Sequence, residues 1–213
     1  MKPIGLRPRL ASSAATRPLA SILFSILAML APMPGNADTL AETINVAVAS
    51  NFATTMKLVK QRFEQGSEHR INLISGSSGK QFAQIINGAP FDLYLSADVQ
   101  RPRQLLARGL GTESEYCVYA LGQLALWSRQ ENQQINSNNL SNNKDLGRLA
   151  IANPEIAPYG MAAVQVINTL GLMPELAPKL VRGENVSQAF QFAYSGNAEL
   201  GFIALSQALS HAA

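Results

Sequence analysis

The chain has 213 residues, of which 47% are hydrophobic and 15% are charged, and it contains one cysteine. A single cysteine excludes a disulfide framework and a metal cluster built from several thiolates. The 17 Lys and Arg residues outnumber the 14 Asp and Glu residues, but four of the basic residues and none of the acidic ones lie within residues 1–37. The remaining 13 basic and 14 acidic residues give a formal charge of −1, so charge provides no reason to expect nucleic acid as a partner.

Residues 1–37 have the pattern of an export signal. Four basic residues precede a 13-residue apolar run at residues 19–31, and the small residues Gly35 and Ala37 follow it. We predict cleavage after Ala37 and export of the remaining 176 of the 213 residues. The alternative is an uncleaved membrane anchor, but the apolar run is shorter than the about 20 residues that a spanning helix needs.

Two strand-to-helix junctions follow in the next part of the chain. The β-branched apolar run at residues 44–49 stops at Ser50 and Asn51, where a helical pattern begins. A second copy has its strand, turn and helix at residues 70–75, 76–80 and 81–86. The free N–H groups of a helix's first turn and the positive end of its dipole bind anions. Two such turns, both rich in small hydroxyl residues, predict a site for one small oxyanion.

From residue 43 onward, apolar strands alternate with helical patterns, which is typical of a mainly parallel sheet flanked by helices. In chain order we predict a strand at 91–97, a helix at 98–108 capped by Asp98, an extended segment at 116–128 and a surface loop at 129–143. A strand at 149–152 and a non-helical path at 153–160 follow. The last predicted elements are helices at about 161–170 and at 186–194 and a strand at 200–205. The long extended segment is of a kind that often passes between two sub-domains. Cys117 lies within it and is expected to be buried.

Catalytic chemistry finds little support in the sequence. The two histidines, His69 and His211, belong to no constellation with a nucleophile and an acid. The glycine-containing turn is not a P-loop, because Ile74 and Gln81 stand where glycine and Ser or Thr are required. Ser78 lacks the second glycine of a serine elbow. Since no carboxylate or histidine cluster has metal-ligand spacing, we predict no catalytic residue, no metal and no cofactor.

Neutral donors at the helix starts remain as the candidate chemistry. A fully ionised tetrahedral oxyanion offers only acceptors, so N–H and O–H groups can hold it without a buried counter-charge. Such charge-assisted hydrogen bonds contribute about 1.5 to 3 kcal/mol each. Each serine taken alone is equally well explained as a helix cap. Two consecutive strand–serine–helix units favour the anion site.

Four stretches carry a resemblance to a known family: VAVASNFATTM at residues 46–56, GSSGKQFAQIINGAPFDLYLSAD at 76–98, LAIANPEIAPYGMAA at 149–163 and GFIALSQ at 201–207. Together they resemble the periplasmic molybdate-binding proteins of ABC importers, over nearly all of the chain after residue 37. The resemblance implies an α/β, type II-like periplasmic binding protein with two lobes. Each lobe would be a mainly parallel sheet flanked by helices, and one oxyanion would lie in the cleft without bound cations.

The resemblance also implies which residues bind the ligand. Ser50 and Asn51 would supply side-chain and backbone donors from the first helix start, and Ser78 would supply the same from the second. On the other lobe, Tyr159 and Val186 would contribute backbone N–H groups.

The sequence departs from the family pattern in two places. One branch of the family completes its site with a tyrosine hydroxyl at the position of Ala204, so this chain resembles the branch that uses Asn51 instead. Family members also continue past residues 201–207 with a strand that crosses back and a closing helix, whereas this sequence stops at residue 213. We therefore expect a first lobe at residues 38–120, without its C-terminal part, and a second lobe at 121–213.

The function implied by the resemblance is capture of molybdate or tungstate in the periplasm and delivery to a membrane permease with its ATPase. The protein would act as a monomer, without enzymatic activity, and its lobes would close around the anion. Two alternatives stay open: another tetrahedral oxyanion such as sulfate as ligand, and, in a different class, an exported serine hydrolase that uses Ser78. Molybdate and tungstate demand the same donors in a cavity of nearly the same size, so the sequence does not separate them.

Overall fold

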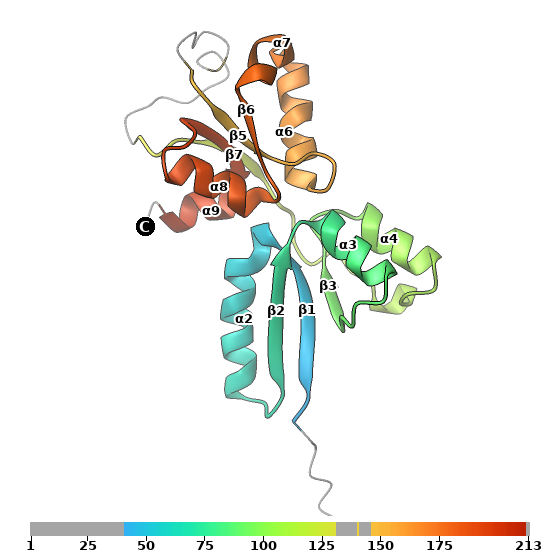
Figure 1. Cartoon of the computed structure of the whole chain (residues 1–213). Helices are drawn as coiled ribbons and strands as arrows, with labels where there is room; N and C mark the ends of the chain where they lie inside the picture. Colours follow the sequence, from blue (N-terminus) through green and yellow to red (C-terminus); the bar gives the residue numbers. More distant parts are fainter. Residues whose placement is uncertain (1–40, 131–139, 141–145, 212–213) are drawn as a thin grey trace, which may run out of the picture. The chain divides into compact units, whose positions relative to one another are not determined.

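The computed structural model describes residues 41–130, 140 and 146–211 (Figure 1). The predicted signal segment at residues 1–37 and most of the predicted loop at 129–143 lie outside the described residues. The described residues from Ala41 onward belong to one compact unit. No helix among them combines the length and the hydropathy that crossing a membrane requires.

The first sheet has three parallel strands in the order β2-β1-β3, formed by β1 (Thr43–Ala49), β2 (Arg70–Gly76) and β3 (Leu93–Leu95). The register pairs Thr43 with Arg70 at one end and Ala49 with Gly76 at the other. Because β1 and β2 end at the same level, the turns that follow them leave the same edge of the sheet.

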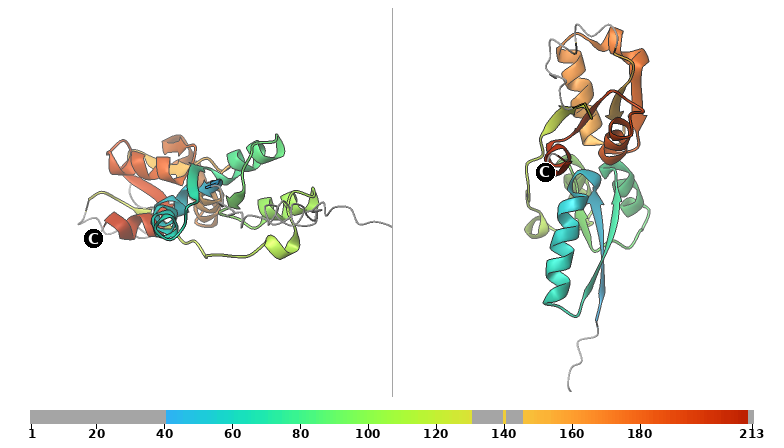
Figure 2. Two further views of the ribbon diagram at one scale, coloured as in Figure 1. Left: turned by 90° about the horizontal axis from the view of Figure 1, so that it is seen from below. Right: turned by 90° about the vertical axis from the view of Figure 1, so that its left-hand side faces the viewer.

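Helices cover both faces of this sheet. The helical elements of this part of the chain are η2 (Ser50–Phe52), α2 (Ala53–Gln65), α3 (Ser78–Ile86), α4 (Gln100–Ala107) and η3 (Glu113–Glu115). The helices α2 and α3 lie on opposite sides of the strands (Figures 1 and 2). Met56 of α2 packs with Val46, Val48 and Ile71 of the strands to form a small apolar core.

The second sheet has four strands in the order β4-β7-β5-β6. They are β4 (Leu124–Trp127), β5 (Leu149–Ala152), β6 (Leu180–Gly183) and β7 (Leu200–Ala204). β5 runs parallel to β6 and to β7, and β4 runs antiparallel to β7. The accompanying helical elements are α6 (Pro158–Thr169), α7 (Met173–Leu176), η4 (Ala177–Lys179), α8 (Val186–Tyr194) and α9 (Leu205–His211).

The second sheet is buried on both faces, with α6 and α8 on opposite sides of it (Figure 1). Ile167 of α6 packs with Leu149 and Ile151 on one side, and Phe190 of α8 packs with Ile203 on the other. All four residues of β5 are fully buried. Burial on both faces explains why β5 is a continuous apolar run rather than an alternating one.

The predicted fold class is confirmed: helices flank two sheets in which parallel pairing predominates. The boundaries of β5 and α8 agree with the prediction, but three helix starts differ. α3 begins at Ser78 rather than residue 81, because Ser77 already caps it. α6 begins at Pro158 rather than about residue 161, since proline suits the first helical position. The N-cap residue of α4 is Val99, although the Asp98 carboxylate still accepts a hydrogen bond from its first turn.

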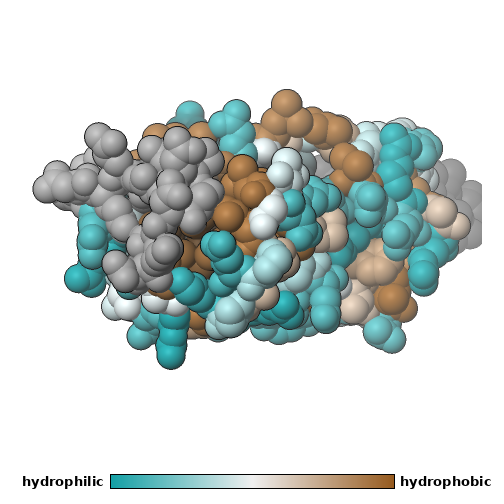
Figure 3. Space-filling model, turned by 90° about the horizontal axis from the view of Figure 1, so that it is seen from above, coloured by the Kyte–Doolittle hydropathy of each residue, from teal (hydrophilic) through white to brown (hydrophobic). Residues whose placement is uncertain are grey.

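Residues 116–123, predicted to be extended, form no regular secondary structure, and only β4 follows as a strand. The predicted burial of Cys117 is wrong, since this residue is exposed. No strand of the described chain pairs with this segment, and its apolar residues are largely exposed: Val118 is 60% and Leu121 91% exposed. Figure 3 shows one face of the molecule, on which hydrophilic residues are interspersed with hydrophobic patches.

Candidate anion-binding site

The end of β1 leads directly into η2, which carries two of the predicted site residues. Ser50 is its first residue and is buried, and the Ser50 hydroxyl has no hydrogen-bond partner in the described part of the chain. The Asn51 Oδ1 atom is buried and likewise lacks a partner there. The Asn51 oxygen has given up water without gaining a protein partner. An amide oxygen only accepts hydrogen bonds, so the donors of Asn51 are its Nδ2 group and its backbone N–H.

The start of α3 leaves one backbone donor available. The Lys80 N–H donates to the Ser77 Oγ atom at 3.4 Å, and the Gly79 N–H donates to the carbonyl oxygen of Ile156 at 2.8 Å. The first N–H groups of a helix have no partner inside it. The N–H of Ser78 is therefore left without an acceptor among the described residues.

The Ser78 side chain is arranged to donate. Its Oγ atom accepts a hydrogen bond from the N–H of Ala97 at 2.9 Å, so the hydroxyl can donate its own proton, and the Tyr94 hydroxyl is one group that interacts with this side chain. The Tyr94 hydroxyl donates to the carbonyl oxygen of Ser78 at 2.8 Å. Burial raises the pKa of Tyr94 to about 12, which keeps this hydroxyl neutral and able to donate. Ser78 itself is only 1% exposed.

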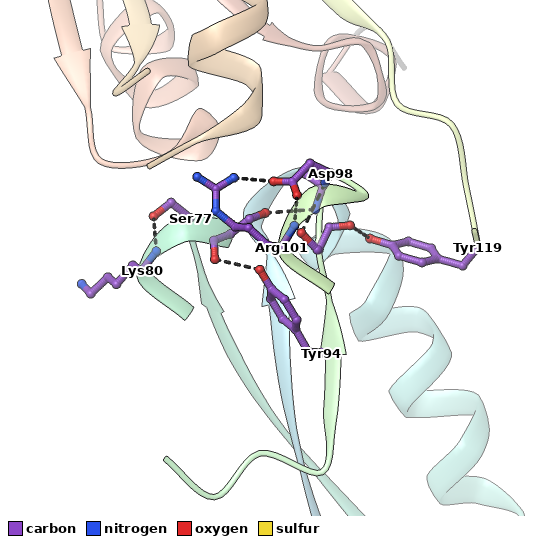
Figure 4. Close-up of polar contacts among 9 residues, drawn as sticks. Ser77, Lys80, Tyr94, Asp98, Arg101 and Tyr119 are labelled. Atoms are coloured by element: carbon purple, nitrogen blue, oxygen red, sulfur yellow. Dashed lines mark hydrogen bonds and ion pairs between the residues drawn. The ribbon is translucent and has the colours of Figure 1, made fainter. Parts of the chain in front are cut away.

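Charged groups near α3 are paired. Figure 4 shows Asp98 and Arg101 together at the start of α4, close to Ser77. Their side chains form an ion pair that is largely shielded from solvent. Lys80 forms a second pair with Glu184, with 3.1 Å between the Lys80 Nζ atom and a carboxylate oxygen. The Asp98 carboxylate is thus compensated and would repel a bound anion less than a free one would.

The start of α6 also leaves one backbone donor. Pro158 has no N–H, and the N–H groups of Gly160 and Met161 donate to the carbonyl oxygen of Ala157 at 2.9 and 3.1 Å. The Tyr159 N–H is the remaining donor of that turn. Burial raises the pKa of the Tyr159 hydroxyl, while the Asn51 side chain beside it opposes that rise.

The start of α8 repeats this arrangement. The Asn185 Oδ1 atom accepts from the N–H groups of Ser187 and Gln188 at 3.0 and 3.1 Å. Asparagine is a favoured N-cap residue for this reason. The Val186 N–H is therefore the donor that the cap leaves over.

Contacts between the two halves bring these helix starts together. The Ser187 Oγ atom donates to the carbonyl oxygen of Ser50 at 3.2 Å, and the Ser206 Oγ atom donates to that of Asn51 at 3.3 Å. Together with the contact from Gly79 to the loop before α6, they join the helix starts that carry all five predicted residues. That these residues contact an anion stays a prediction.

A cavity of about 1250 Å³ lies next to this region. Asn51 and Tyr159 line it, whereas Ser50, Ser78 and Val186 do not. Most of its wall comes from residues 88–124. The cavity is thus mainly separate from the space between the helix starts.

Sequence reasoning missed several residues that shape the site. Ser77, rather than Ser78, caps α3, and Ser187 and Gln207 form a hydrogen-bonded pair behind Ser50. Gln81 appeared in the sequence only as a mismatch to a nucleotide-binding motif, yet it is buried beneath the site. The adjacent serines Ser77 and Ser78 were the one local sign of the cap of α3. The hydrogen bonds of Ser187 and Gln81 join residues that are far apart in the chain.

No group of three or more His, Cys, Asp or Glu side chains within the described ranges is arranged to hold a metal ion. The donors described above are N–H and O–H groups, which suit an anion rather than a cation.

The sequence and the fold match a known class of protein. A family model described as bacterial extracellular solute-binding protein matches residues 44–213, and the chain belongs to this family.

Individual relatives are more specific. The chain is 42% identical over 167 residues to the molybdate-binding protein ModA of Azotobacter vinelandii, which covers 78% of this chain and 66% of that protein. It is 39% identical over 169 residues to ModA of Rhodobacter capsulatus, and the match covers 79% of this chain and 67% of that protein. The solved structure of the Azotobacter vinelandii periplasmic molybdate-binding protein superposes with a TM-score of 0.73 at 37% identity, covering 76% of this chain and 71% of that one. The chain thus spans about two thirds of the length of these two ModA proteins.

Proposed function

We propose that this protein binds molybdate, or tungstate, as a tetrahedral dianion between the helix starts of its two halves. The observation that carries the proposal is the pattern of unused donors. At the starts of α3, α6 and α8, neighbouring N–H groups are engaged and those of Ser78, Tyr159 and Val186 are left over. The resemblance to ModA proteins supports molybdate as the anion.

In this proposal the two halves have complementary roles. Ser50, Asn51 and Ser78 contribute side-chain and backbone donors, while Tyr159 and Val186 contribute backbone donors. We assign the first group to a lobe at residues 38–120 and the second to a lobe at 121–213. The lobes would close on the anion, because donors on both sides gain partners only when the anion lies between them.

The cellular role follows from the same family relationship. The protein would be exported to the periplasm by the segment at residues 1–37, bind the anion as a monomer and present it to a membrane permease with its ATPase. It would carry out no chemistry on its ligand. The one candidate nucleophile, Ser78, has a backbone N–H as its Oγ partner, and a backbone N–H cannot take up the proton of a nucleophilic hydroxyl.

Isothermal titration of the purified protein with molybdate, tungstate, sulfate and phosphate tests the proposal. Molybdate should bind more tightly than phosphate by more than charge alone predicts, because phosphate near neutral pH retains a proton that needs an acceptor. Sulfate should bind more weakly because it is smaller. Equal affinities for all four anions would contradict a shaped tetrahedral site, and hydrolysis of a model ester that disappears in Ser78→Ala would favour the hydrolase instead.

A further inference from the structure

Gln81 is a polar residue in one of the most buried positions of the described chain. It is the fourth residue of α3 and is 1% exposed. Its Nε2 atom donates two hydrogen bonds, to the carbonyl oxygen of Val48 at 2.9 Å and to that of Ile74 at 2.7 Å. Val48 belongs to β1 and Ile74 to β2, so one side-chain amide joins a helix to two neighbouring strands.

These two carbonyl groups lie close to the ends of their strands. β1 ends one residue after Val48, and β2 ends two residues after Ile74. Ser50 follows the first strand end, and Ser78 opens the helix that carries Gln81. The Gln81 amide therefore ties together the three elements whose spacing determines how far the donors at Ser50 lie from those at Ser78.

The other half of the Gln81 amide has no partner. Its Oε1 atom is buried and unpaired within the described part of the chain, which costs free energy. A methionine of similar length would fill the same space without burying a polar atom. The contribution of Gln81 is consequently geometric more than energetic, because its two donated hydrogen bonds specify where α3 sits.

The same helix turn also touches the other half of the molecule. Gly79 donates to the carbonyl oxygen of Ile156, and Lys80 pairs with Glu184. A β-carbon on Gly79 would lie 2.7 Å from the Ile156 oxygen, so the two backbones are in close contact. A small shift of α3 would therefore disturb both the donors at Ser78 and the contact with the second half.

We propose that Gln81 is a positioning residue for anion binding: its side-chain amide holds the start of α3 against the ends of β1 and β2 and so sets the spacing of the donors at Ser50 and Ser78. This inference rests on the proposed oxyanion-binding function. Gln81 itself does not contact the anion.

Four variants test this role. Gln81→Met removes both hydrogen bonds at nearly constant volume, and Gln81→Glu keeps the shape but introduces an ionisable group. Gln84 lies on the exposed face of the same helix, so Gln84→Met and Gln84→Glu are matched controls. Each protein is titrated with molybdate from about pH 6.5 to about pH 9, under conditions where circular dichroism shows it to be folded.

We expect the Kd of Gln81→Met to rise about tenfold at every pH while the stoichiometry stays normal. Burial should raise the pKa of the carboxyl group introduced by Gln81→Glu, so that it ionises within this range. Its negative charge would then oppose the bound dianion, and the affinity of Gln81→Glu should fall further as the pH increases. The affinities of the wild type and of both Gln84 variants should not change with pH in this way. If Gln81 were important only for stability, the affinity of Gln81→Glu would not change with pH either.

A Kd for Gln81→Met within about twofold of the wild type, together with a flat pH profile for Gln81→Glu, overturns the proposal. If one of these two variants does not fold, the other decides alone. Failure of the wild type to bind molybdate is a different result: it rejects the proposed function and this inference with it. Normal wild-type binding with unaffected Gln81 variants rejects the positioning role only.

Discussion

The two halves of this chain present donors of different kinds. Around the first sheet, hydroxyl and amide side chains at Ser50, Asn51 and Ser78 accompany the backbone N–H groups. Around the second sheet, the available donors at Tyr159 and Val186 are backbone N–H groups alone. A single substitution can delete a donor from the first half, whereas in the second half it must move the backbone. Under the proposed function, substitutions in the first half would therefore change affinity directly, and substitutions in the second half would change it through the fold.

The halves also differ in how firmly they are built. The two main apolar clusters around the second sheet contain ten and seven buried residues, whereas the cluster around the first sheet contains four. Burial stabilises in proportion to the apolar area removed from water. The second half therefore provides the more rigid framework, which suits a set of donors that depends on backbone position.

The largest effect is expected from Gly160→Ala. A β-carbon at Gly160 would lie 2.2 Å from the carbonyl oxygen of Ala152, a backbone atom that cannot rotate away. The start of α6 would be displaced, and with it the Tyr159 N–H. We expect a loss of about 3 kcal/mol in the free energy of unfolding, measured by denaturant titration, and a more than hundredfold loss of molybdate affinity.

Gly66→Ala is the control for that substitution, since a β-carbon there meets nothing within 4 Å. Its effect on stability should stay below about 0.5 kcal/mol. A Gly160→Ala protein as stable as the wild type would show that the second half is less rigid than its packing indicates.

Ser78→Ala should weaken molybdate binding without unfolding the protein. It removes a hydroxyl donor from a desolvated dianion and leaves the N–H of Ala97 without its acceptor. The expected loss of affinity by calorimetry is tenfold to a hundredfold, or about 1 to 3 kcal/mol. Ser77→Ala removes the neighbouring cap instead and should cost about 1 kcal/mol of stability with little change in affinity. Equal affinities for wild type and Ser78→Ala would mean that Ser78 is not a ligand.

Alkaline pH should destabilise the first half. The pKa of Tyr94 is about 12 in the folded protein and 10.0 ordinarily, so its stabilising contribution is complete below about pH 10 and is lost as the pH rises toward 12. Tyr94→Phe should lose about 1 kcal/mol of stability at neutral pH, because the bond to the Ser78 carbonyl disappears, and should show a smaller alkaline loss than the wild type.

Thermal melts from pH 8 to 11.5 measure this effect. Tyr194→Phe is the control in the second half, where the tyrosine is 48% exposed, and should melt like the wild type throughout. An unchanged alkaline loss in Tyr94→Phe would place its origin elsewhere in the molecule.

The smallest effect is expected for the ion pair between the halves. Lys80 and Glu184 are 52% and 42% exposed, so the coupling energy from a double-mutant cycle of Lys80→Gln and Glu184→Gln should stay below about 1 kcal/mol. It should shrink further in high salt. A coupling above about 2 kcal/mol would show that this contact, rather than the donors, holds the halves together.

Several features could be predicted from the sequence because their causes are local. The run at residues 149–152 is apolar at every position, as a strand buried on both faces requires, and β5 has those bounds. Asn185 is a strong helix cap, and α8 begins directly after it. The alternation of strands and helices similarly predicted the fold class. Local patterns also placed Ser50 and Asn51 where a strand leads into a helix, whereas Ser78, Tyr159 and Val186 were assigned to the site by the family resemblance.

Other features depended on residues distant in the sequence. Cys117 is exposed because no strand of the described chain pairs with its segment, although its apolar neighbours predicted burial. The partners of Gln81 lie 7 and 33 residues away along the chain. Hydrogen-bond partners and burial are properties of the assembled chain, and local propensity contains no information about them. The sequence by itself therefore determined the order and approximate location of most strands and helices, whereas only the tertiary structure decided which N–H groups are used up, which remain available, and what holds them at their spacing.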